Sequence, residues 1–270
     1  MFNNLLLDSL RCPECRLGGL TNITPDTLTC VGCGAVFPLV QGRPVLLRRD
    51  NELFSVNAYA HSSAKRFTSA RYFKLPNPSV NLASRRVLGK LKLRLQAIDY
   101  VPTVLVVGGG KQRVWLDSLL GAVDRRYKII YTDIDSSADV DIYCDGHDLP
   151  FKDDSCDAVI TTAVLEHVLY PERVAAEITR VLKVDGLLYS ELPFMQQVHE
   201  GAYDFTRYTL SGHRRLFNSF KEIDSGLVAG PATALVWSIE NFTLAFVRRA
   251  LFRKLMKVIV RIFFGWLKYL

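Results

Sequence analysis

The sequence predicts an α/β fold built on a mostly parallel, doubly wound sheet, with a small metal-binding module before the sheet and a helical tail after it. Three observations carry this prediction. Five apolar runs alternate with helical patterns between residues 101 and 230, which is typical of strand–helix–strand units. Four cysteines form two close pairs within residues 1–48, and residues 231–270 have a helical pattern to their end.

The first module, residues 1–48, has the cysteine spacing of a four-thiolate metal site. Two C-x2-C pairs are separated by fourteen residues, and each pair fits a tight turn whose thiolates point at one ion. So small a module has too little core to fold alone, and bound zinc would hold it together in a purely structural role. The expected zinc ligands are Cys12, Cys15, Cys30 and Cys33, with disulfides or a rubredoxin-type iron site as the alternatives.

The next segment, residues 49–100, is expected to be a basic linker that contains a helix. From residue 43 to residue 100 the chain has twelve lysines and arginines against three acids, whereas residues 101–240 have thirteen against twenty-one. The acidic central domain therefore argues against a broad nucleic-acid-binding face. Residues 84–98 predict a helix with leucines at 88, 91 and 95 on one face, and its cations would either contact phosphates or face solvent.

The central domain, residues 101–230, opens with a buried strand that breaks into three glycines. The run Val104–Val107 predicts the strand, and glycines at 108–110 would let a nucleotide-like ligand approach the backbone. A second run ends at Asp133, about two dozen residues later, where an acidic side chain can accept both hydroxyls of a ribose. A third run presents the sequence D-G-H at residues 145–147.

Two further strands complete the predicted parallel sheet. The fourth extends from Asp157 to about Thr161 and leads toward Glu166 and His167. A helix is expected over residues 171–183, because proline suits its first turn and cations lie near its end. A turn and a fifth strand follow. All of the loops after these strands share one edge of the sheet, where such folds bind ligands.

In this order, the pieces resemble the class I S-adenosylmethionine-dependent methyltransferases, and most closely the methyltransferase type 11 group. The resemblance covers roughly residues 100–228 and rests on the glycine bend, Asp133 and the sequences D-G-H-D-L-P-F, V-L-E-H-V and R-V-L-K-V-D-G-L-L. It implies a Rossmann-like sheet that binds S-adenosylmethionine. Two residues depart from the family pattern, because Val106 replaces an acid and Gln112 replaces a glycine. The implied cofactor-binding residues are Gly108, Gly109, Gly110, Asp133, Asp145, Gly146 and His147.

The first module also resembles a known type of subunit. The sequence CPEC, followed by LTCVGCGAVFPLVQGRPVLL, is similar to the small zinc-ribbon activator subunit of tRNA and protein methyltransferases. A similar ribbon precedes the methyltransferase domain of some ribosomal-RNA guanine methyltransferases. The resemblance implies that the ribbon docks onto the domain or presents the substrate.

The segment after the fifth strand is too long and too rich in polar and aromatic residues for a simple connector. It resembles the H-x4-D-x2-R-Y-T segment of methyltransferases from surface-polysaccharide loci, which forms part of the acceptor pocket and leads into a helix. Methyl transfer mainly requires positioning of the acceptor and removal of one proton. Alternatively, an Arg207–Asp204 pair only pins the loop. The candidate catalytic residues are His199 as the base, Glu166 or His167 as alternative bases, and Asp204, Arg207 and Tyr208 as acceptor contacts.

Residues 231–270 predict an amphipathic helical tail. From residue 253 onward, an apolar sector and a cationic stripe suit a helix that lies in an anionic membrane surface, so peripheral membrane contact through residues 241–270 is expected. Burial against the domain and a dimer contact are the alternatives, and the number of cations argues against a membrane span. The stripe consists of Arg253, Lys254, Lys257, Arg261 and Lys268.

Residues 220–230 predict a sixth strand, but no later segment predicts the seventh, antiparallel strand with which class I methyltransferases usually end. Truncation before that strand is therefore one alternative. The amino end lacks the basic region and long apolar run of a secretory signal. Cys144 and Cys156 fall in or beside predicted strands, and this use of cysteine favours the reducing cytoplasm.

These observations predict a cytoplasmic, membrane-associated methyltransferase that acts on a small-molecule or glycolipid acceptor. The favoured acceptor is a saccharide or a lipid-linked intermediate of cell-surface biosynthesis at the inner membrane face. Methylation of ribosomal or transfer RNA is the alternative function. A non-catalytic methyltransferase-like scaffold is the second alternative.

Overall fold

A nine-stranded sheet organises the chain, with the strand order β1-β2-β3-β4-β7-β6-β5-β8-β9. The computed structural model describes residues 4–60, 81, 83–110, 113–120, 127–199 and 201–269. The central domain supplies five parallel strands, which confirms the predicted fold class. These strands are β5 (Thr103–Val107), β6 (Lys128–Asp133), β7 (Ile142–Cys144), β8 (Cys156–Thr162) and β9 (Leu182–Glu191).

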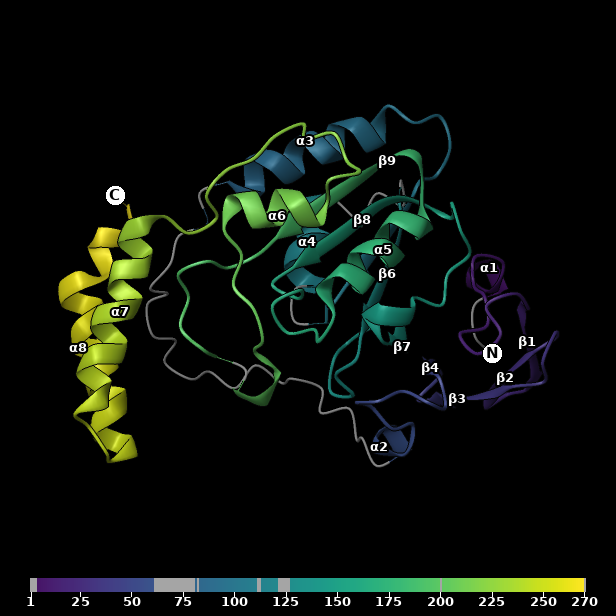
Figure 1. The fold of residues 1–270 in the computed structure, drawn as a ribbon, viewed down its shortest axis with the longest axis horizontal. Helices are drawn as coiled ribbons and strands as arrows, with labels where there is room; N and C mark the ends of the chain where they lie inside the picture. Colours follow the sequence, from purple (N-terminus) through teal and green to yellow (C-terminus); the bar gives the residue numbers. More distant parts are fainter. Residues whose placement is uncertain are drawn as a thin grey trace.

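Helices cover both faces of the parallel strands (Figure 1). On one face, Val104 and Val106 of β5 belong to the same apolar cluster as the buried leucines of α3 (Ser84–Gln96) and α4 (Arg113–Leu120). On the other face, alternate β5 residues pack with α5 (Pro171–Val181). The predicted linker helix is confirmed, since its leucines at 88, 91 and 95 are buried. Residues 111 and 112, which follow the glycine bend and include Gln112, lie outside the described part of the chain.

The amino-terminal module is joined to the central sheet by its last strand. Its strands are β1 (Leu20–Thr24), β2 (Thr27–Cys30), β3 (Val36–Val40) and β4 (Arg43–Leu46), preceded by α1 (Asn4–Leu7). These four strands pair with one another as antiparallel neighbours, and β4 also pairs in parallel with β7. The register sets residue 45 opposite 143 and residue 46 opposite 144. The ribbon is therefore an extension of the sheet. The short helix α2 (Asn57–Ala60) follows β4.

The segment after α5 differs from its predicted form. The helix was expected to reach residue 183 and to be followed by a turn, but it ends at Val181 and β9 begins at once. A bulge lies inside β9, because Cys156 pairs with Leu182 whereas Ala158 pairs with Leu187. The bulge contains a residue in the left-handed region, at 185. The expected turn is thus absorbed into the strand as a bulge, which keeps the sheet pairing on both sides.

The predicted sixth strand over residues 220–230 is wrong. This segment follows α6 (Leu210–Leu216) and has no regular secondary structure. Its apolar residues Ile223 and Leu227 are exposed, so it has no buried face to pack as a strand. Instead, Asp224 forms ion pairs with Arg86 and Lys90, which fix the segment against α3.

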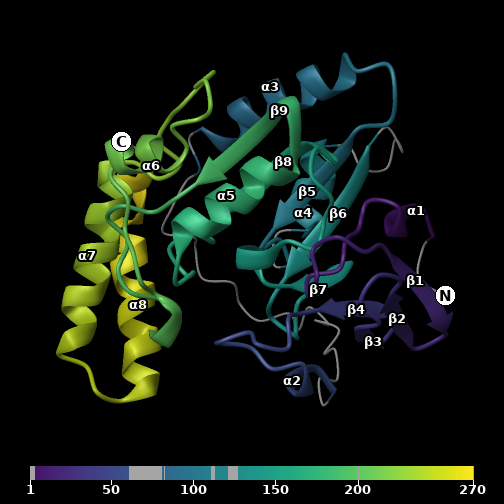
Figure 2. The ribbon, with the colours of Figure 1, turned by 45° about the vertical axis from the view of Figure 1, so that its right-hand side comes forward.

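The carboxyl-terminal tail is helical, as predicted, but it folds back on itself. It consists of α7 (Pro231–Ala245), α8 (Ala250–Phe264) and the 3-10 turn η4 (Gly265–Tyr269). Figures 1 and 2 show this hairpin standing beside the rest of the molecule, on the side toward which β9 points. Within the described part of the chain, no helix combines the length and apolar character needed to cross a membrane.

The hairpin turns much of the predicted cationic stripe inward. Arg261 donates hydrogen bonds to both oxygens of Glu240 at 2.7 and 3.1 Å, and the Lys257 ammonium lies 3.7 Å from the same carboxylate. Arg253 donates to the carbonyls of Leu244 and Val247 at the end of α7. The apolar side of α8 is left facing outward, because Glu240 and the terminal carbonyls of α7 attract the cations to the inner side.

Candidate active site and metal centre

The four cysteines of the ribbon converge as predicted. Their sulfur atoms all lie within 4.8 Å of one another, and the Cys12–Cys33 and Cys15–Cys30 pairs are each 3.7 Å apart. Sulfur atoms at about 2.3 Å from a tetrahedral zinc ion lie about 3.8 Å from each other. The cluster therefore fits zinc. All four cysteines are free, so the disulfide alternative is wrong.

Backbone N–H groups point at the sulfur atoms of this cluster. The amide of Gly18 donates to Cys15 at 3.4 Å, and the amides of Gly32 and Cys33 donate to Cys30 at 3.3 and 3.4 Å. The hydrogen bonds from Gly18 and Leu17 lower the pKa of Cys15 to about 6. A side chain at Gly18 would overlap the Cys30 sulfur. The turn is thus shaped to hold thiolates.

The glycine bend and Asp133 lie next to each other at the carboxyl edge of the sheet. β5 and β6 are paired with residue 107 opposite 132, and the carbonyl of Thr132 accepts hydrogen bonds from Gly108 and Gly109 at 2.9 and 3.1 Å. The Gly110 amide donates to Asp133 Oδ2 at 3.2 Å. The sequence prediction placed a cofactor over these two features, and the structure brings them within hydrogen-bond distance.

The bend tolerates only glycine. Gly108 has a φ of +70°, and a Cβ there would overlap Val164. A Cβ on Gly109 would overlap Val106, and one on Gly110 would overlap Ala138. The backbone can make these close contacts because it carries no side chains.

Asp133 has room for one more donor. Its Oδ1 accepts hydrogen bonds from the amides of Ile134 and Asp135, while Oδ2 accepts only that of Gly110 in the described part of the chain. A carboxylate oxygen has two lone pairs, so Oδ2 can still accept a ribose hydroxyl. Burial raises the pKa of Asp133. The residues at this end of the site fit a nucleoside.

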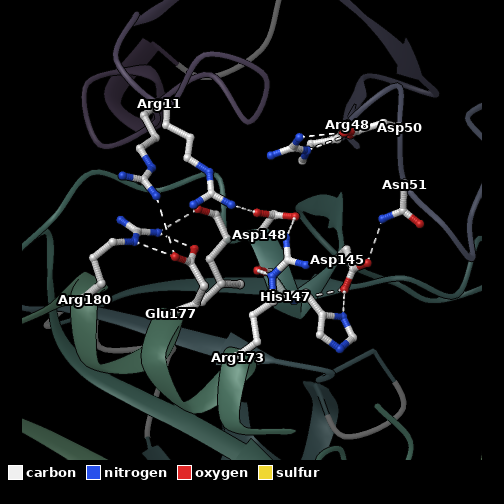
Figure 3. Close-up of polar contacts among 12 residues, drawn as sticks. Arg11, Arg48, Asp50, Asn51, Asp145, His147, Asp148, Arg173, Glu177 and Arg180 are labelled. Carbon is white, nitrogen blue, oxygen red and sulfur yellow. Dashed lines mark hydrogen bonds and ion pairs between the residues drawn. The ribbon is translucent and has the colours of Figure 1, made fainter. Parts of the chain in front are cut away.

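The side chain of Asp145, by contrast, already has protein partners. Its Oδ1 accepts from the backbone and ring nitrogens of His147 at 2.9 and 2.6 Å, and its Oδ2 accepts from Asn51 at 2.7 Å (Figure 3). Burial alone would raise the pKa of Asp145, but these hydrogen bonds outweigh burial and lower it. Gly146, which lies between Asp145 and His147 in the chain, begins the 3-10 turn η2 (Gly146–Asp148). The family resemblance implies that the adenine of the cofactor lies near residues 145–147, and this contact stays a prediction.

A cavity of about 140 Å³ lies beside this carboxylate. It is lined by the segment that leaves the ribbon, from Arg48 to Leu53, together with His147, Tyr170 and Arg173. Asn51 was missed from the sequence because the linker was interpreted only as positive charge and a helix. The signal was its position, about five residues after the strand that ends at Leu46.

Ion pairs join the ribbon to the face of α5 (Figure 3). Arg11 pairs with Asp153 at 3.1 Å and lies 3.7 Å from Glu177, and Arg16 pairs with Asp148. Arg180 completes the group with hydrogen bonds to Glu177 at 2.6 and 2.8 Å. The ribbon is thus held against the domain through charges as well as through β4.

The turn after β8 carries Glu166 and His167. It begins at Ala163, whose φ of +54° lies in the left-handed region that side chains rarely adopt. Glu166 is fully buried, and burial raises its pKa to about 7. Among the described residues, neither of its carboxylate oxygens accepts a hydrogen bond. A buried carboxyl without such partners is costly and often has a functional role.

His167 and His199 face each other beside Glu166. The two Nε2 atoms are 3.1 Å apart, and His167 Nε2 lies 3.7 Å from Glu166 Oε1. Each Nδ1 lies next to a backbone carbonyl, that of Tyr203 at 2.6 Å for His167 and that of Gln197 at 3.2 Å for His199. The structure thus brings three of the candidate catalytic residues into one cluster.

The other three candidates shape the loop around this cluster. Asp204 pairs with Arg207, in agreement with the alternative that the pair pins the loop, and its Oδ2 accepts from the His199 amide at 2.8 Å. The hydrogen bonds from Arg207 lower the pKa of Asp204 well below its usual value. The Tyr208 amide donates a hydrogen bond to the carbonyl of Pro193, and burial raises the pKa of the Tyr208 hydroxyl. The Asp204 side chain is 1% exposed and supports the loop, and its contact with an acceptor stays a prediction.

In the described part of the basic linker, three of the five cations of α3 are tied to protein groups. Arg86 and Lys90 of α3 pair with Asp224, and Lys92 donates to the carbonyl of Leu119. Cations tied to protein groups in this way are less available to phosphates. The arrangement of α3 therefore does not favour the RNA interpretation.

A comparison with family models identifies the type of the central domain. Residues 105–190 match the family model described as a methyltransferase domain. No curated protein matches the sequence. Among solved structures, the complex between the Haloferax volcanii Trm112 methyltransferase activator and a methyltransferase is similar, at 23% identity over 50% of this chain and 68% of that chain, with a TM-score of 0.34.

Two other solved structures are similar to parts of the chain. One is Haemonchus contortus phosphoethanolamine N-methyltransferase 2 with S-adenosyl-L-methionine, at 14% identity over 52% of this chain and 37% of that chain, with a TM-score of 0.39. The other is the PH0226 protein of Pyrococcus horikoshii, at 16% identity over 54% of this chain and 85% of that chain, with a TM-score of 0.39.

Proposed function

From the premise that residues 105–190 are a methyltransferase domain, we propose that this chain transfers the methyl group of S-adenosylmethionine to an oxygen, nitrogen or carbon atom of a saccharide or lipid-linked acceptor at a membrane surface. Dependence on S-adenosylmethionine follows from the family. The observation that carries the proposal is the contact between the glycine bend and Asp133, with 3.2 Å between the Gly110 amide and Oδ2.

Different residues around the glycine bend would bind different parts of the cofactor. Gly108 and Gly110 would lie against the cofactor, and Asp133 would accept its ribose hydroxyls. When bound, S-adenosylmethionine supplies a methyl group on a positively charged sulfur, which a nucleophile can displace. The cluster after β8 and the segment 193–209 would orient the acceptor, with His199, Glu166 and His167 as the candidate groups that handle its proton.

Calorimetry with S-adenosylhomocysteine tests the cofactor site. The wild-type chain should bind it, and Asp133→Asn should bind at least tenfold more weakly, because an amide accepts ribose hydrogen bonds less well than a carboxylate. Asp135→Asn, at the exposed neighbouring carboxylate, is the matched control and should bind as the wild type does. Absence of heat at millimolar ligand would support the scaffold interpretation instead.

The helical hairpin supports a membrane-bound acceptor. Its outward side exposes Phe252, Leu255, Ile259 and Phe263, which follow one another at three- and four-residue spacing. The first three of them also line a groove of about 490 Å³ at the junction of α7 and α8, together with Arg248 and Arg249. After Glu240 the chain has seven lysines and arginines and no acid, although Arg253, Lys257 and Arg261 are engaged by α7. Exposed apolar side chains rimmed by cations suit one occupant, the surface of an anionic bilayer.

Co-sedimentation with vesicles tests this part of the proposal. Phosphatidylglycerol-containing vesicles should bind the protein, and pure phosphatidylcholine vesicles should bind it much less. Phe252→Ser together with Phe263→Ser should reduce binding at least tenfold. Val114→Ser, at a still more exposed apolar residue of α4, is the control and should bind as the wild type does. Equal pelleting of all three proteins would remove the membrane contact from the proposal.

We further propose that zinc occupies the four-cysteine cluster and that its role is structural. The 3.7 Å spacing of the sulfur atoms and the amides directed at them support this assignment. Four thiolates complete the coordination of zinc, so this ion would not contact the acceptor. Metal analysis of the purified protein should find one zinc ion that the Cys30→Ser variant lacks.

A further inference from the structure

The two histidines behind the segment 193–209 face each other in a way that needs a positive charge between them. Only 3.1 Å separates the Nε2 atoms of His167 and His199. The Nδ1 atoms of both rings lie against backbone carbonyls, which can only accept hydrogen bonds, so each Nδ1 carries the proton of its neutral ring. Both Nε2 atoms then present lone pairs to each other, and these repel unless a cation or a proton lies between them.

Glu166 adds a carboxylate to the same place. It is 0% exposed, and both of its oxygens lack a hydrogen-bond donor among the described residues. Its Oε1 lies 3.7 Å from His167 Nε2, and one ligand atom from each of the three residues lies within 4.8 Å of the others. A proton shared by the two rings would bridge the nitrogens and still leave the carboxylate without a partner. A metal cation can contact all three groups.

From this geometry we propose that Glu166, His167 and His199 bind a divalent first-row transition-metal ion. Two ligand atoms at about 2.1 Å from one ion lie about 3.0–3.4 Å apart, which matches the 3.1 Å between the two nitrogens. Two imidazoles and one carboxylate are a ligand set for ions such as Mn²⁺, Fe²⁺ or Zn²⁺ that leaves other coordination positions open.

The hydrogen bonds around His167 and His199 resemble those around metal-ligating histidines in general. A ligating histidine generally donates its second N–H to a carbonyl or carboxylate, which fixes the tautomer. The carbonyls of Tyr203 and Gln197 take this role here, and the Asp204–Arg207 pair holds the His199 amide. These hydrogen bonds explain why the segment 193–209 folds back over the turn after β8.

The proposed metal site would restrict the chemical class of the acceptor. This step rests on the proposed function. The side chains of His167 and His199 are 19% and 29% exposed, so an ion bound to them could be reached from solvent. In this arrangement the three side chains would hold the ion instead of taking the acceptor's proton, and a hydroxyl oxygen in contact with the ion would release its proton to solvent water at lower pH. In the transfer, an oxygen–carbon bond would form as the carbon–sulfur bond breaks, and the sulfur would keep that electron pair as a neutral thioether. The acceptor is therefore a hydroxyl compound.

Metal binding can be measured without cofactor or acceptor. Full-length protein with zinc in its four-cysteine cluster is titrated with Mn²⁺, followed by electron paramagnetic resonance, and separately with Co²⁺, followed by calorimetry. One additional ion per chain is expected. Glu166→Gln and His199→Gln should each weaken its binding at least tenfold. His213→Gln removes a histidine of α6 whose Nε2 lies 2.9 Å from the Ser190 hydroxyl, and it should bind as the wild type does.

The outcomes separate this proposal from the proposed function. Failure of both ions to bind the wild type at millimolar concentration, or equal binding by wild type and both variants, would overturn the metal site. Thermal melting checks that the variants fold, and His199→Gln, at a partly exposed side chain, keeps the test valid if Glu166→Gln does not. Loss of S-adenosylhomocysteine binding with the metal retained would overturn the methyltransferase proposal alone.

Discussion

The ribbon and the hairpin flank the same sheet, but only the ribbon is built into it. β4 pairs with β7, and Leu10 and Leu28 of the ribbon share an apolar cluster with Leu105 of β5. Among the described residues, the hairpin supplies none to either of the two clusters that pack on the sheet. The ribbon and the sheet should therefore depend on each other, whereas the hairpin holds itself together and keeps its apolar side for something outside the chain.

The largest effect is expected on removing the ribbon's metal. Cys30→Ser should abolish zinc binding, which provides about 10–16 kcal/mol in small zinc modules, so residues 10–47 should lose protection from hydrogen exchange. Because β4 borders β7, the amides of β7 should also exchange faster. Cys144→Ser, at a buried cysteine outside the cluster, should keep its zinc. Unchanged exchange in β7 would break the claim that ribbon and sheet depend on each other.

A smaller effect is expected inside the hairpin. Glu240→Ala should cost about 3 kcal/mol locally, because it leaves Arg261 and Lys257 without their shared carboxylate. Hydrogen exchange should accelerate in α7 and α8 and stay unchanged in β5 to β9. Glu222→Ala, which removes an exposed partner of Arg214, should change neither region. A lower melting temperature of the sheet in Glu240→Ala would show that the hairpin supports it after all.

The sheet itself contains a buried carboxylate, that of Asp157, which lies in β8 and is 5% exposed. Burial alone would raise the pKa of Asp157, but hydrogen bonds from Lys183, Tyr100 and the Thr103 amide outweigh burial and lower it. The stability that the ionised Asp157 carboxylate adds to the folded state is therefore present above the unfolded pKa of 3.8. This stability is lost as pH falls through the lower folded pKa.

Asp157→Asn should thus cost about 2 kcal/mol in urea unfolding at neutral pH. The difference from wild type should shrink as the solution is acidified below the unfolded pKa. A difference that stays constant down to strong acid would mean that the carboxylate's charge does not stabilise the sheet.

The smallest effect is expected on deleting residues 231–270. The melting temperature of the remaining chain should stay within about 2 °C of the wild type, since a change below about 0.5 kcal/mol is expected when no core contact is lost. Vesicle binding should disappear in the same variant. A large drop in melting temperature would contradict the contrast between the two appendages.

The sequence was sufficient where local signals define the structure. The run Val104–Val107 and the glycines after it predict a strand and a tight bend, and Asp133 follows at the spacing that adjacent parallel strands require. The cysteine pairs predict a cluster because each turn sets the direction of its own thiolates. The candidate catalytic residues Glu166, His167 and His199 meet because both of their loops leave the same sheet edge.

The remaining features depend on contacts between distant residues. The pairing of β4 with β7 joins segments about a hundred residues apart, and nothing local in R-P-V-L selects that neighbour. The hairpin turn at residues 246–249 contains no glycine or proline, so the helical pattern continues through it. Its position is fixed by Arg253 and Glu240, whose partners lie in the opposite helix.

The parallel pairing of β4 also has a consequence during synthesis. The ribbon is complete once residue 48 has left the ribosome, but the neighbour of β4 ends at residue 144. At about 5–20 residues per second, the outer edge of β4 waits roughly 5–20 seconds for its partner. An uncovered strand edge invites pairing with other nascent chains. Expression at low ribosome density or with a chaperone that shields such edges should therefore raise the yield of correctly folded protein.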